Sequence, residues 1–267
     1  MFLKKKYGQN LLADTSFIYR MTKESDLDSS CCIFEIGPGT GCLTKELLSV
    51  VKEVTAIEID TDFRPELNKL ESLYPGKLNI IYGDILKCDL PSILDKTKNW
   101  NVFANIPYYI TSPIIELLLE NRHLFNNIYL TVQKEVAERI CAVAGSKDRG
   151  SFSCYTQYYA ECHLHFTIPA GAFMPPPKVD SAFMSMKIHK NPLIEEPYKK
   201  IRPLIARAFE MRRKTLRNSL SNFSQNILEL LEIAGVNPGA RPQELGLNDF
   251  AEIAKALENA KDSLIHE

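Results

Sequence analysis

The chain has 267 residues, which is long enough for one large domain, or a large domain with a small appendage, around a substantial core. Apolar residues make up 45% of it and charged residues 24%, so we expect an ordinary soluble globular protein. Its net charge of -1 indicates neither a nucleic-acid partner nor a membrane partner, so the kind of partner has to be inferred from local clusters of charge.

The cysteines and the N-terminus indicate a reducing compartment. Seven cysteines, an odd number without a CxxC pair, predict free and mostly buried thiols rather than disulfides or a zinc site. No apolar stretch approaches the roughly 20 residues that a membrane span needs. The three lysines at residues 4–6 are not followed by the apolar core of a secretory signal. We therefore expect a cytoplasmic protein with no metal site.

From residue 31 onward, short apolar runs alternate with helical patterns. Strands separated by helices of about ten residues indicate crossover connections, and hence a mostly parallel sheet covered on both faces. The sequence therefore predicts a doubly wound α/β domain within residues 1–192. The expected strands are 31–36, 53–59, 78–83, 102–104 and 127–132, and the expected helices are 43–51, 63–73, 113–122 and 134–144.

The pattern changes after about residue 150. Residues 151–168 and 181–190 have the composition of two strands with no helix between them, so we expect them to pair antiparallel and to close one edge of the sheet. From about residue 197 three amphipathic segments follow one another. They predict a small helical domain over residues 193–267.

The stretch "EIGPGTGCLT" places Gly37, Gly39 and Gly41 between the first strand and the first helix. Glycines there allow a tight turn and a close approach of the backbone to a ligand. Glu58 ends the next strand and can accept hydrogen bonds from both hydroxyls of a ribose. Asp84 ends the third strand, where it could accept from an adenine amino group. Three successive strand ends of this kind predict a site for S-adenosylmethionine.

The fourth strand ends in "NIPYYI", beside the expected position of the reactive methyl group. An aromatic amino group is a poor nucleophile, and two acceptors on its hydrogens would free its lone pair. Asn105 offers a side-chain oxygen and Ile106 a backbone carbonyl, which Pro107 holds in an extended conformation. Tyr108 offers a flat face on which a base can stack.

These motifs together resemble the family of ribosomal RNA adenine dimethyltransferases, and within it the bacterial enzymes that act on 16S RNA. The matching stretches run nearly end to end: "KKYGQNLLAD", "EIGPGTGCLT", "AIEID", "GDIL", "NIPYYITSPII", "QKEVAERI", "FMPPPKVDSA" and "RRKTLRNSL". The glycine loop is shared by many methyltransferases. The first, fifth and last of these stretches in one chain are highly specific.

The resemblance implies a Rossmann-like class I methyltransferase domain and a helical C-terminal RNA-binding domain. It implies that the N-terminal loop lies across the cofactor, so that Asn10 and Leu12 are matched cofactor-binding positions. It also implies that Phe173 closes over the target adenine opposite Tyr108. The other matched cofactor-binding positions are Gly37, Glu58, Asp84 and Asn105. Two residues depart from the family pattern: Leu11 where an aromatic is usual, and Tyr109 where many relatives have a polar residue.

The implied reaction is the transfer of the sulfonium methyl group to the exocyclic nitrogen of two adjacent adenosines in the 3'-terminal hairpin loop of 16S rRNA, twice on each base. Alignment of nitrogen, carbon and sulfur provides most of the acceleration, and no strong base is needed. We therefore assign no catalytic role to His123, His163 or His165. We expect the small ribosomal subunit as the partner, a role in its biogenesis, and a monomer.

Local charge supports an RNA partner. Residues 199–217 carry a net charge of +7 in 19 positions, and such a cluster is an electrostatic footprint for phosphates. Its eight basic residues, which we call the basic cluster, are Lys199, Lys200, Arg202, Arg207, Arg212, Arg213, Lys214 and Arg217, against Glu210. Residues 4–6 are three lysines that could add a second patch.

Three alternatives stay open at this point. The related 23S rRNA methyltransferases that confer macrolide resistance use the same chemistry on a different RNA, but "RRKTLRNSL" and "FMPPPKVDSA" favour the small-subunit enzyme. A non-catalytic nucleic-acid-binding paralogue would keep the fold, but Asn105, Pro107 and Tyr108 are intact. A small-molecule methyltransferase would have no use for a basic helical domain.

Overall fold

The computed structural model describes residues 10–265, and the side chains up to residue 260. The predicted lysine patch at residues 4–6 lies outside the described residues. Contacts between Cα atoms divide the chain into two compact units. The first comprises residues 1–137 and 161–188, and the second comprises residues 138–160 and 189–267.

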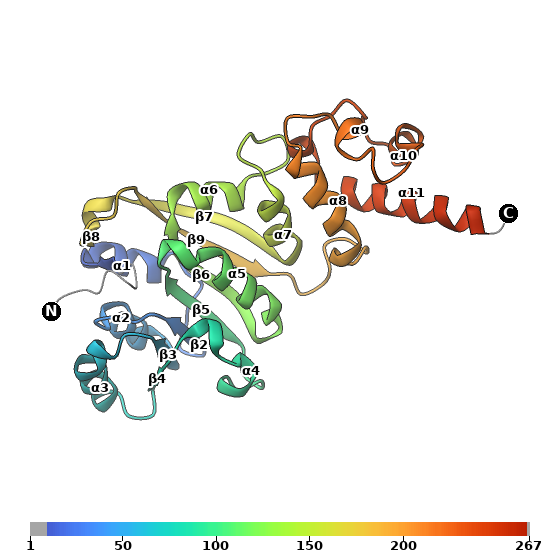
Figure 1. Ribbon diagram of the computed structural model, residues 1–267. Helices are drawn as coiled ribbons and strands as arrows, with labels where there is room; N and C mark the ends of the chain where they lie inside the picture. Colours follow the sequence, from blue (N-terminus) through green and yellow to red (C-terminus); the bar gives the residue numbers. More distant parts are fainter. Residues whose placement is uncertain (1–9, 266–267) are drawn as a thin grey trace. The chain divides into compact units, whose positions relative to one another are not determined.

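The first unit is built on a seven-stranded sheet with the strand order β4-β3-β2-β5-β6-β9-β7 (Figure 1). The strands from β4 to β6 are parallel to their neighbours, and β9 is antiparallel to β6. The predicted α/β fold with a mostly parallel sheet is confirmed. The strands are β2 (Cys32–Ile36), β3 (Glu53–Glu58), β4 (Leu78–Tyr82), β5 (Trp100–Asn105), β6 (Phe125–Gln133), β7 (Ala160–Ile168) and β9 (Ser181–Ile188).

The parallel strands are joined by helices, as crossover connections require. These are α2 (Cys42–Val50), α3 (Arg64–Leu73), α4 (Leu90–Ile93) and α5 (Thr111–Glu120), with α1 (Thr15–Lys23) before the sheet and α6 (Lys134–Cys141) after β6. Because side chains alternate along a strand, the sheet has two apolar faces. One packs on α1 and α2 through a core that includes Met21, Leu47 and Phe103. Helix α5 covers the other (Figure 1).

A short two-stranded ribbon pairs β1 (Leu11–Leu12) with β8 (Phe173–Met174). Leu12 is opposite Phe173, and the N–H groups of Ala13 and Asp14 donate to the carbonyl of Ala172. The sequence did not predict this ribbon. It ties the segment that enters α1 to the segment before β9.

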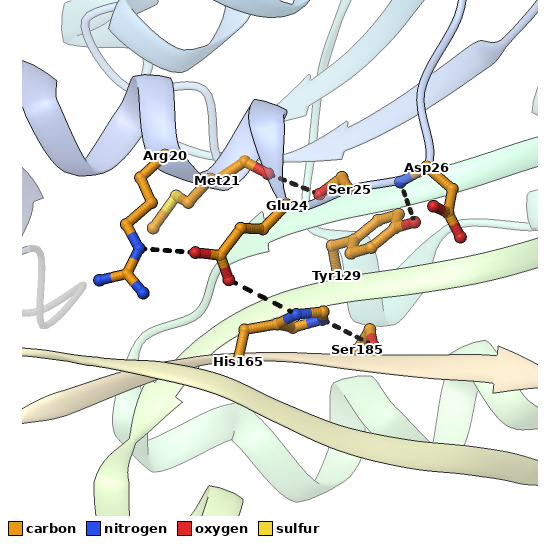
Figure 2. A network of polar contacts seen from close by, with 8 residues as sticks. All are labelled: Arg20, Met21, Glu24, Ser25, Asp26, Tyr129, His165 and Ser185. Atoms are coloured by element: carbon orange, nitrogen blue, oxygen red, sulfur yellow. Dashed lines mark hydrogen bonds and ion pairs between the residues drawn. The ribbon is translucent and has the colours of Figure 1, made fainter.

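Polar side chains hold the end of α1 on the sheet (Figure 2). Arg20 donates to Glu24 across 2.7 Å, and Glu24 lies 3.8 Å from Nδ1 of His165, whose Nε2 lies 2.9 Å from the Ser185 hydroxyl. Burial lowers the pKa of His165. The network gives this histidine a structural role on the sheet.

The prediction of a strand over residues 151–168 is wrong in its first half. Residues 151–159 form helix α7 (Ser151–Tyr159), and only β7 beyond them is a strand. Aromatic residues and threonine favour a strand locally, but Cys154 is buried in the apolar core of the second unit, and this packing selects the helix. The two late strands β7 and β9 are neighbours at one edge of the sheet, so the predicted pairing of these strands and the closure of that edge are confirmed. Strand β7 is outermost, and β9 is antiparallel to β6 on its other side.

The second unit is helical. Its main helices are α7, α8 (Tyr198–Glu210), α9 (Leu216–Ser219), α10 (Ile227–Ile233) and α11 (Leu247–Ile265). Their apolar faces share one core with Leu204, Leu231 and Phe250 at its centre. The three predicted C-terminal helices are thus confirmed. Helix α7 joins this unit although it precedes the boundary expected at residue 192.

The expectations about the cysteines and about membrane spans can be compared with the structure of residues 10–265. The seven cysteines are free thiols, but only Cys32 and Cys154 are buried, and Cys42 is exposed. Within this part of the chain no helix has the length and apolar content that crossing a membrane requires.

Candidate active site

A cavity of about 280 Å³ opens at the carboxyl ends of the parallel strands in the first unit. This is the edge where ligands bind in open α/β sheets. Ile36, Ile57 and Ile106 contribute apolar walls from β2, β3 and the end of β5. Six of the eight residues predicted for the site line this cavity: Asn10, Gly37, Glu58, Asp84, Asn105 and Tyr108.

The glycine loop is shaped by backbone conformations that other residues rarely adopt. Gly37 has a φ of 74° and Gly39 a φ of 56°. A Cβ on Gly39 would come within 2.9 Å of a Leu11 side-chain carbon. The loop therefore makes the tight turn that the sequence predicted for these glycines, and the missing side chain of Gly39 leaves room for Leu11.

Glu58 organises this loop as well as lining the cavity. Its side chain is 3% exposed and accepts hydrogen bonds from the N–H of Gly39 at 2.9 Å and of Asp60 at 2.8 Å. Burial raises its pKa, while these hydrogen bonds act in the opposite direction. A carboxylate has about four acceptor positions. Acceptor capacity therefore remains for the hydroxyls of a ribose, so the residue fits a nucleoside ligand.

Asp84 lies at the end of β4 and begins the 3-10 turn Ile85–Lys87. Its carboxylate accepts from the N–H of Leu86 at 3.1 Å and lies 3.8 Å from the Lys87 ammonium. The side chain is partly exposed and retains free acceptor positions. An amino group at the edge of an adenine could donate to it.

Asn105 and Tyr108 are each held by one hydrogen bond. The Asn105 Nδ2 donates to the carbonyl of Asn10 at 2.9 Å, and this bond leaves the side-chain oxygen as the free acceptor. The Tyr108 hydroxyl lies 2.9 Å from the hydroxyl of Ser181 at the start of β9. Burial raises the pKa of Tyr108, so the phenol stays neutral. The site therefore presents an oriented amide oxygen next to a fixed aromatic ring.

Two predicted residues do not reach this cavity. Leu12 lines a second, smaller cavity of about 40 Å³ beside it, together with Glu35 and Asn105. Phe173 is 4% exposed and packs in the core below α1 and α2. The contact expected between Phe173 and a base in the cavity is therefore absent from this arrangement, and its catalytic role stays a prediction.

Sequence reasoning missed Glu35, which precedes the glycine loop on β2. It is 2% exposed, and burial raises the pKa of its carboxyl to about 8, an effect that the nearby Thr44 hydroxyl offsets only in part. Among the described residues, Oε2 of Glu35 has no hydrogen-bond partner. The signal was visible in the sequence as one acidic residue inside an apolar strand.

We expect Glu35→Gln to be better tolerated than other substitutions there. Because the folded state holds the proton more tightly than the unfolded state, the stability that Glu35 contributes is present below about pH 4.5 and is lost as pH rises through about 8. Glutamine does not ionise, so the variant should gain about 1–3 kcal/mol relative to the parent protein between pH 5 and 8. Urea unfolding of both proteins across this pH range measures the difference in unfolding free energy. The same dependence of this free energy on pH in both proteins would contradict the expectation.

Comparison with known proteins identifies the family to which the chain with this site belongs. The profile of the ribosomal RNA adenine dimethylase family matches residues 2–259. The chain belongs to this family. It is 39% identical to the ribosomal RNA small subunit methyltransferase A of Shouchella clausii, over 96% of this chain and 90% of that protein. Identity to the protein of the same name from Caldanaerobacter subterraneus is 40%, over 96% and 98%.

Solved structures agree. The chain is similar to a dimethyladenosine transferase from Plasmodium falciparum, with a TM-score of 0.82 and 26% identity over 94% of this chain and 98% of that one. It is also similar to the 23S rRNA methyltransferase ErmE, with a TM-score of 0.75 and 25% identity over 93% and 100%. The resemblance found in the motifs is thus confirmed. As a member of the family the chain is a methyltransferase, with S-adenosylmethionine as its cofactor.

Proposed function

We propose that this protein dimethylates the exocyclic amino groups of two adjacent adenosines in the 3'-terminal hairpin loop of 16S rRNA. The substrate would be the small ribosomal subunit during its biogenesis, and the protein would act as a monomer in the cytoplasm. The observation that carries this proposal is the position of the Asn105 amide, at the same cavity as Glu58 and Asp84 and beside the ring of Tyr108.

S-adenosylmethionine would supply an electrophilic methyl group when bound in this cavity. Glu58 would accept from the ribose, Asp84 from the adenine amino group, and Gly37, Asn10 and Leu12 would border the rest of the cofactor. The hydrogen bond from Asn105 to Asn10 couples the N-terminal segment to the catalytic amide, so that binding of the cofactor and orientation of the acceptor are linked.

At the target base, the side-chain oxygen of Asn105 would accept from one hydrogen of the amino group and the carbonyl of Ile106 from the other. Tyr108 would stack on the base, an interaction that typically contributes about 1 to 3 kcal/mol and offsets much of the cost of unstacking it from RNA. Phe173 would close the opposite side only after a rearrangement of the β1–β8 ribbon, because its side chain is buried.

The alternative substrate is 23S rRNA, on which ErmE acts according to its name. The two relatives at 39% and 40% identity are both named ribosomal RNA small subunit methyltransferase A, and the TM-score to the dimethyladenosine transferase, 0.82, is higher than the 0.75 to ErmE. These likenesses favour the small subunit. A non-catalytic paralogue is disfavoured because the amide, proline and tyrosine at the end of β5 are all present and line the cavity.

We propose that the helical domain over residues 193–267 binds the RNA through the basic cluster. Two of the eight members have intramolecular partners: Lys200 pairs with Glu196 and Glu258, and Arg207 with Glu210. The others are exposed and form no ion pair with a described residue, so they are available to phosphates: Lys199, Arg202, Arg212, Arg213, Lys214 and Arg217.

Reversing two of these charges should weaken RNA binding. We expect Arg212→Glu with Arg213→Glu to raise the Kd for small-subunit RNA by about tenfold or more. The dependence of log K on log salt should become shallower by about one for each phosphate that the variant no longer neutralises. The control reverses Lys69 and Lys96, which are exposed in the first unit, with the same change in net charge. Equal effects in the two variants would remove the basic cluster from the proposal.

The choice between the two ribosomal RNAs can be tested directly. The protein is incubated with S-adenosylmethionine labelled in its methyl group and with a mixture of small subunits lacking the modification and large subunits. Label is expected in the RNA of the small subunit. Label confined to the RNA of the large subunit, or its absence from both, would overturn the proposed function.

A further inference from the structure

A single hydrogen bond ties the Tyr108 ring to the sheet of the first unit. Tyr108 begins the 3-10 turn Tyr108–Ile110, and no residue of this turn is buried. Its hydroxyl lies 2.9 Å from the hydroxyl of Ser181, which follows 73 positions later in the chain. Among the described residues, neither hydroxyl has another hydrogen-bond partner. Because the turn is not packed into the core, the orientation of the ring depends on this bond.

Ser181 is a rigid partner because the backbone around it is fixed. It is the first residue of β9, belongs to the ladder between β9 and β6, and is 0% exposed. The preceding residue, Asp180, accepts from the N–H of Lys134 through its carbonyl and from the N–H of Ala170 through its carboxylate, both at 3.0 Å. The buried Ser181 hydroxyl is not accessible to RNA, so its effect on the reaction passes through Tyr108.

The two methyl transfers to one adenine differ in the number of N–H groups that hold the base. In each transfer the exocyclic nitrogen forms a bond to the methyl carbon, and the bond from that carbon to sulfur breaks with its electron pair staying on sulfur. One proton then leaves the nitrogen for water. An unmodified adenine has two N–H groups, one for Asn105 and one for the Ile106 carbonyl. A base with one methyl group has a single N–H left, so stacking on Tyr108 provides a larger share of its orientation.

We propose that Ser181 is a positioning residue for methyl transfer, and that its bond to Tyr108 matters most for the second methyl group on each base. This inference rests on the proposed function. Displacement at the methyl carbon needs nitrogen, carbon and sulfur in line, and a misplacement of about 1 Å can cost about 100-fold in rate. A ring that is able to rotate still stacks on the base but no longer holds the nitrogen in line. Loss of the bond should therefore lower the rate of transfer more than the affinity for RNA.

Variants at both ends of the bond test this inference. Ser181→Ala removes one hydroxyl, Tyr108→Phe removes the other, and the double variant leaves neither hydroxyl of the pair without a partner. The matched control is Ser185→Ala on the same strand, whose hydroxyl lies 2.9 Å from Nε2 of His165 (Figure 2).

The assay follows the two transfers separately. Each full-length protein is saturated with S-adenosylmethionine and mixed in excess with small subunits that lack the modification. The amounts of N6-methyladenosine and N6,N6-dimethyladenosine are followed over a single turnover. Binding to the same subunits is measured with S-adenosylhomocysteine in place of the methyl donor, and thermal unfolding shows that each variant is folded.

We expect Ser181→Ala to slow the second transfer about tenfold, which corresponds to about 1.4 kcal/mol, and the first transfer by less than about threefold. N6-Methyladenosine should therefore accumulate, while affinity for the subunit stays within about twofold of that of the parent protein. Tyr108→Phe and the double variant should show the same rates as Ser181→Ala, because all three lack the same bond. Ser185→Ala should match the parent protein.

Three results overturn this inference. Unchanged rates in the variants would mean that the bond does not position the ring. Equal slowing of both transfers would mean that Ser181 acts on the fold or on binding instead. A greater loss in the double variant than in Tyr108→Phe would mean that it acts apart from the ring. If Ser181→Ala does not fold, Tyr108→Phe removes the same bond outside the core and has to show the same accumulation. Failure of the parent protein to methylate small subunits would instead overturn the proposed function.

Discussion

Replacing Asn105 with alanine is expected to reduce methyl transfer by a factor of about 100 to 1,000, the range typical for loss of one preorganised polar group at a reacting centre. The variant lacks the acceptor for the amino group of the base. It also loses the bond from Nδ2 to the Asn10 carbonyl. Because that carbonyl lies at the edge of the cavity, we expect cofactor affinity to fall less than about tenfold. Single-turnover methylation and calorimetry measure the two effects separately.

The matched control is Asn101→Ala, which removes the same side chain from the other end of β5. Asn101 is 3% exposed and accepts hydrogen bonds from the backbone and side chain of Asn127. Its loss should lower stability without changing the single-turnover rate of the folded protein. If Asn105→Ala abolished cofactor binding altogether, the residue would be a cofactor ligand first, and the acceptor role would be refuted.

Replacing Glu58 with alanine is expected to have the largest effect on the cofactor, with Kd for S-adenosylmethionine raised by about 100-fold or more. Two acceptors for the ribose disappear, and the N–H groups of Gly39 and Asp60 lose their partner. Each buried group left without a partner costs about 1–3 kcal/mol, so the glycine loop should also loosen. Calorimetric titration measures the affinity, and thermal unfolding measures the cost to the fold.

Two further variants separate these effects. Glu58→Gln keeps the size of the side chain but replaces one of the two oxygens, each of which accepts from one backbone N–H, with an amide donor. It should therefore weaken cofactor binding with less loss of packing. Glu66→Ala removes an exposed carboxylate from α3 and should change neither quantity. An unaltered cofactor affinity in a stably folded Glu58→Ala variant would disprove the ribose assignment.

The parallel sheet could be predicted because its strands are buried on both faces and are therefore nearly continuous apolar runs. Since the carboxyl ends of such strands meet at one edge, the positions of Gly37, Glu58, Asp84 and Asn105 around a common cavity followed from topology alone. No side-chain geometry was needed for this step.

What could not be predicted depends on contacts between distant segments. Helix α7 forms where Cys154 packs into the core of the second unit, and local strand propensity does not reveal such a contact with distant residues. Phe173 is buried because β8 pairs with β1, about 160 positions earlier in the chain. The second role of Glu58, as anchor of the glycine loop, required the backbone geometry of Gly39.

A nucleotide-resolution map of methylated bases in small-subunit RNA, combined with the stoichiometry of transfer, tests the proposed reaction most directly. Subunits that lack the modification are incubated with the protein and S-adenosylmethionine until transfer stops. We predict two adjacent N6,N6-dimethyladenosines in the 3'-terminal hairpin loop, and hence four methyl groups for each RNA. Methylation at another site, or transfer that ends at one methyl group on a single base, would contradict the account.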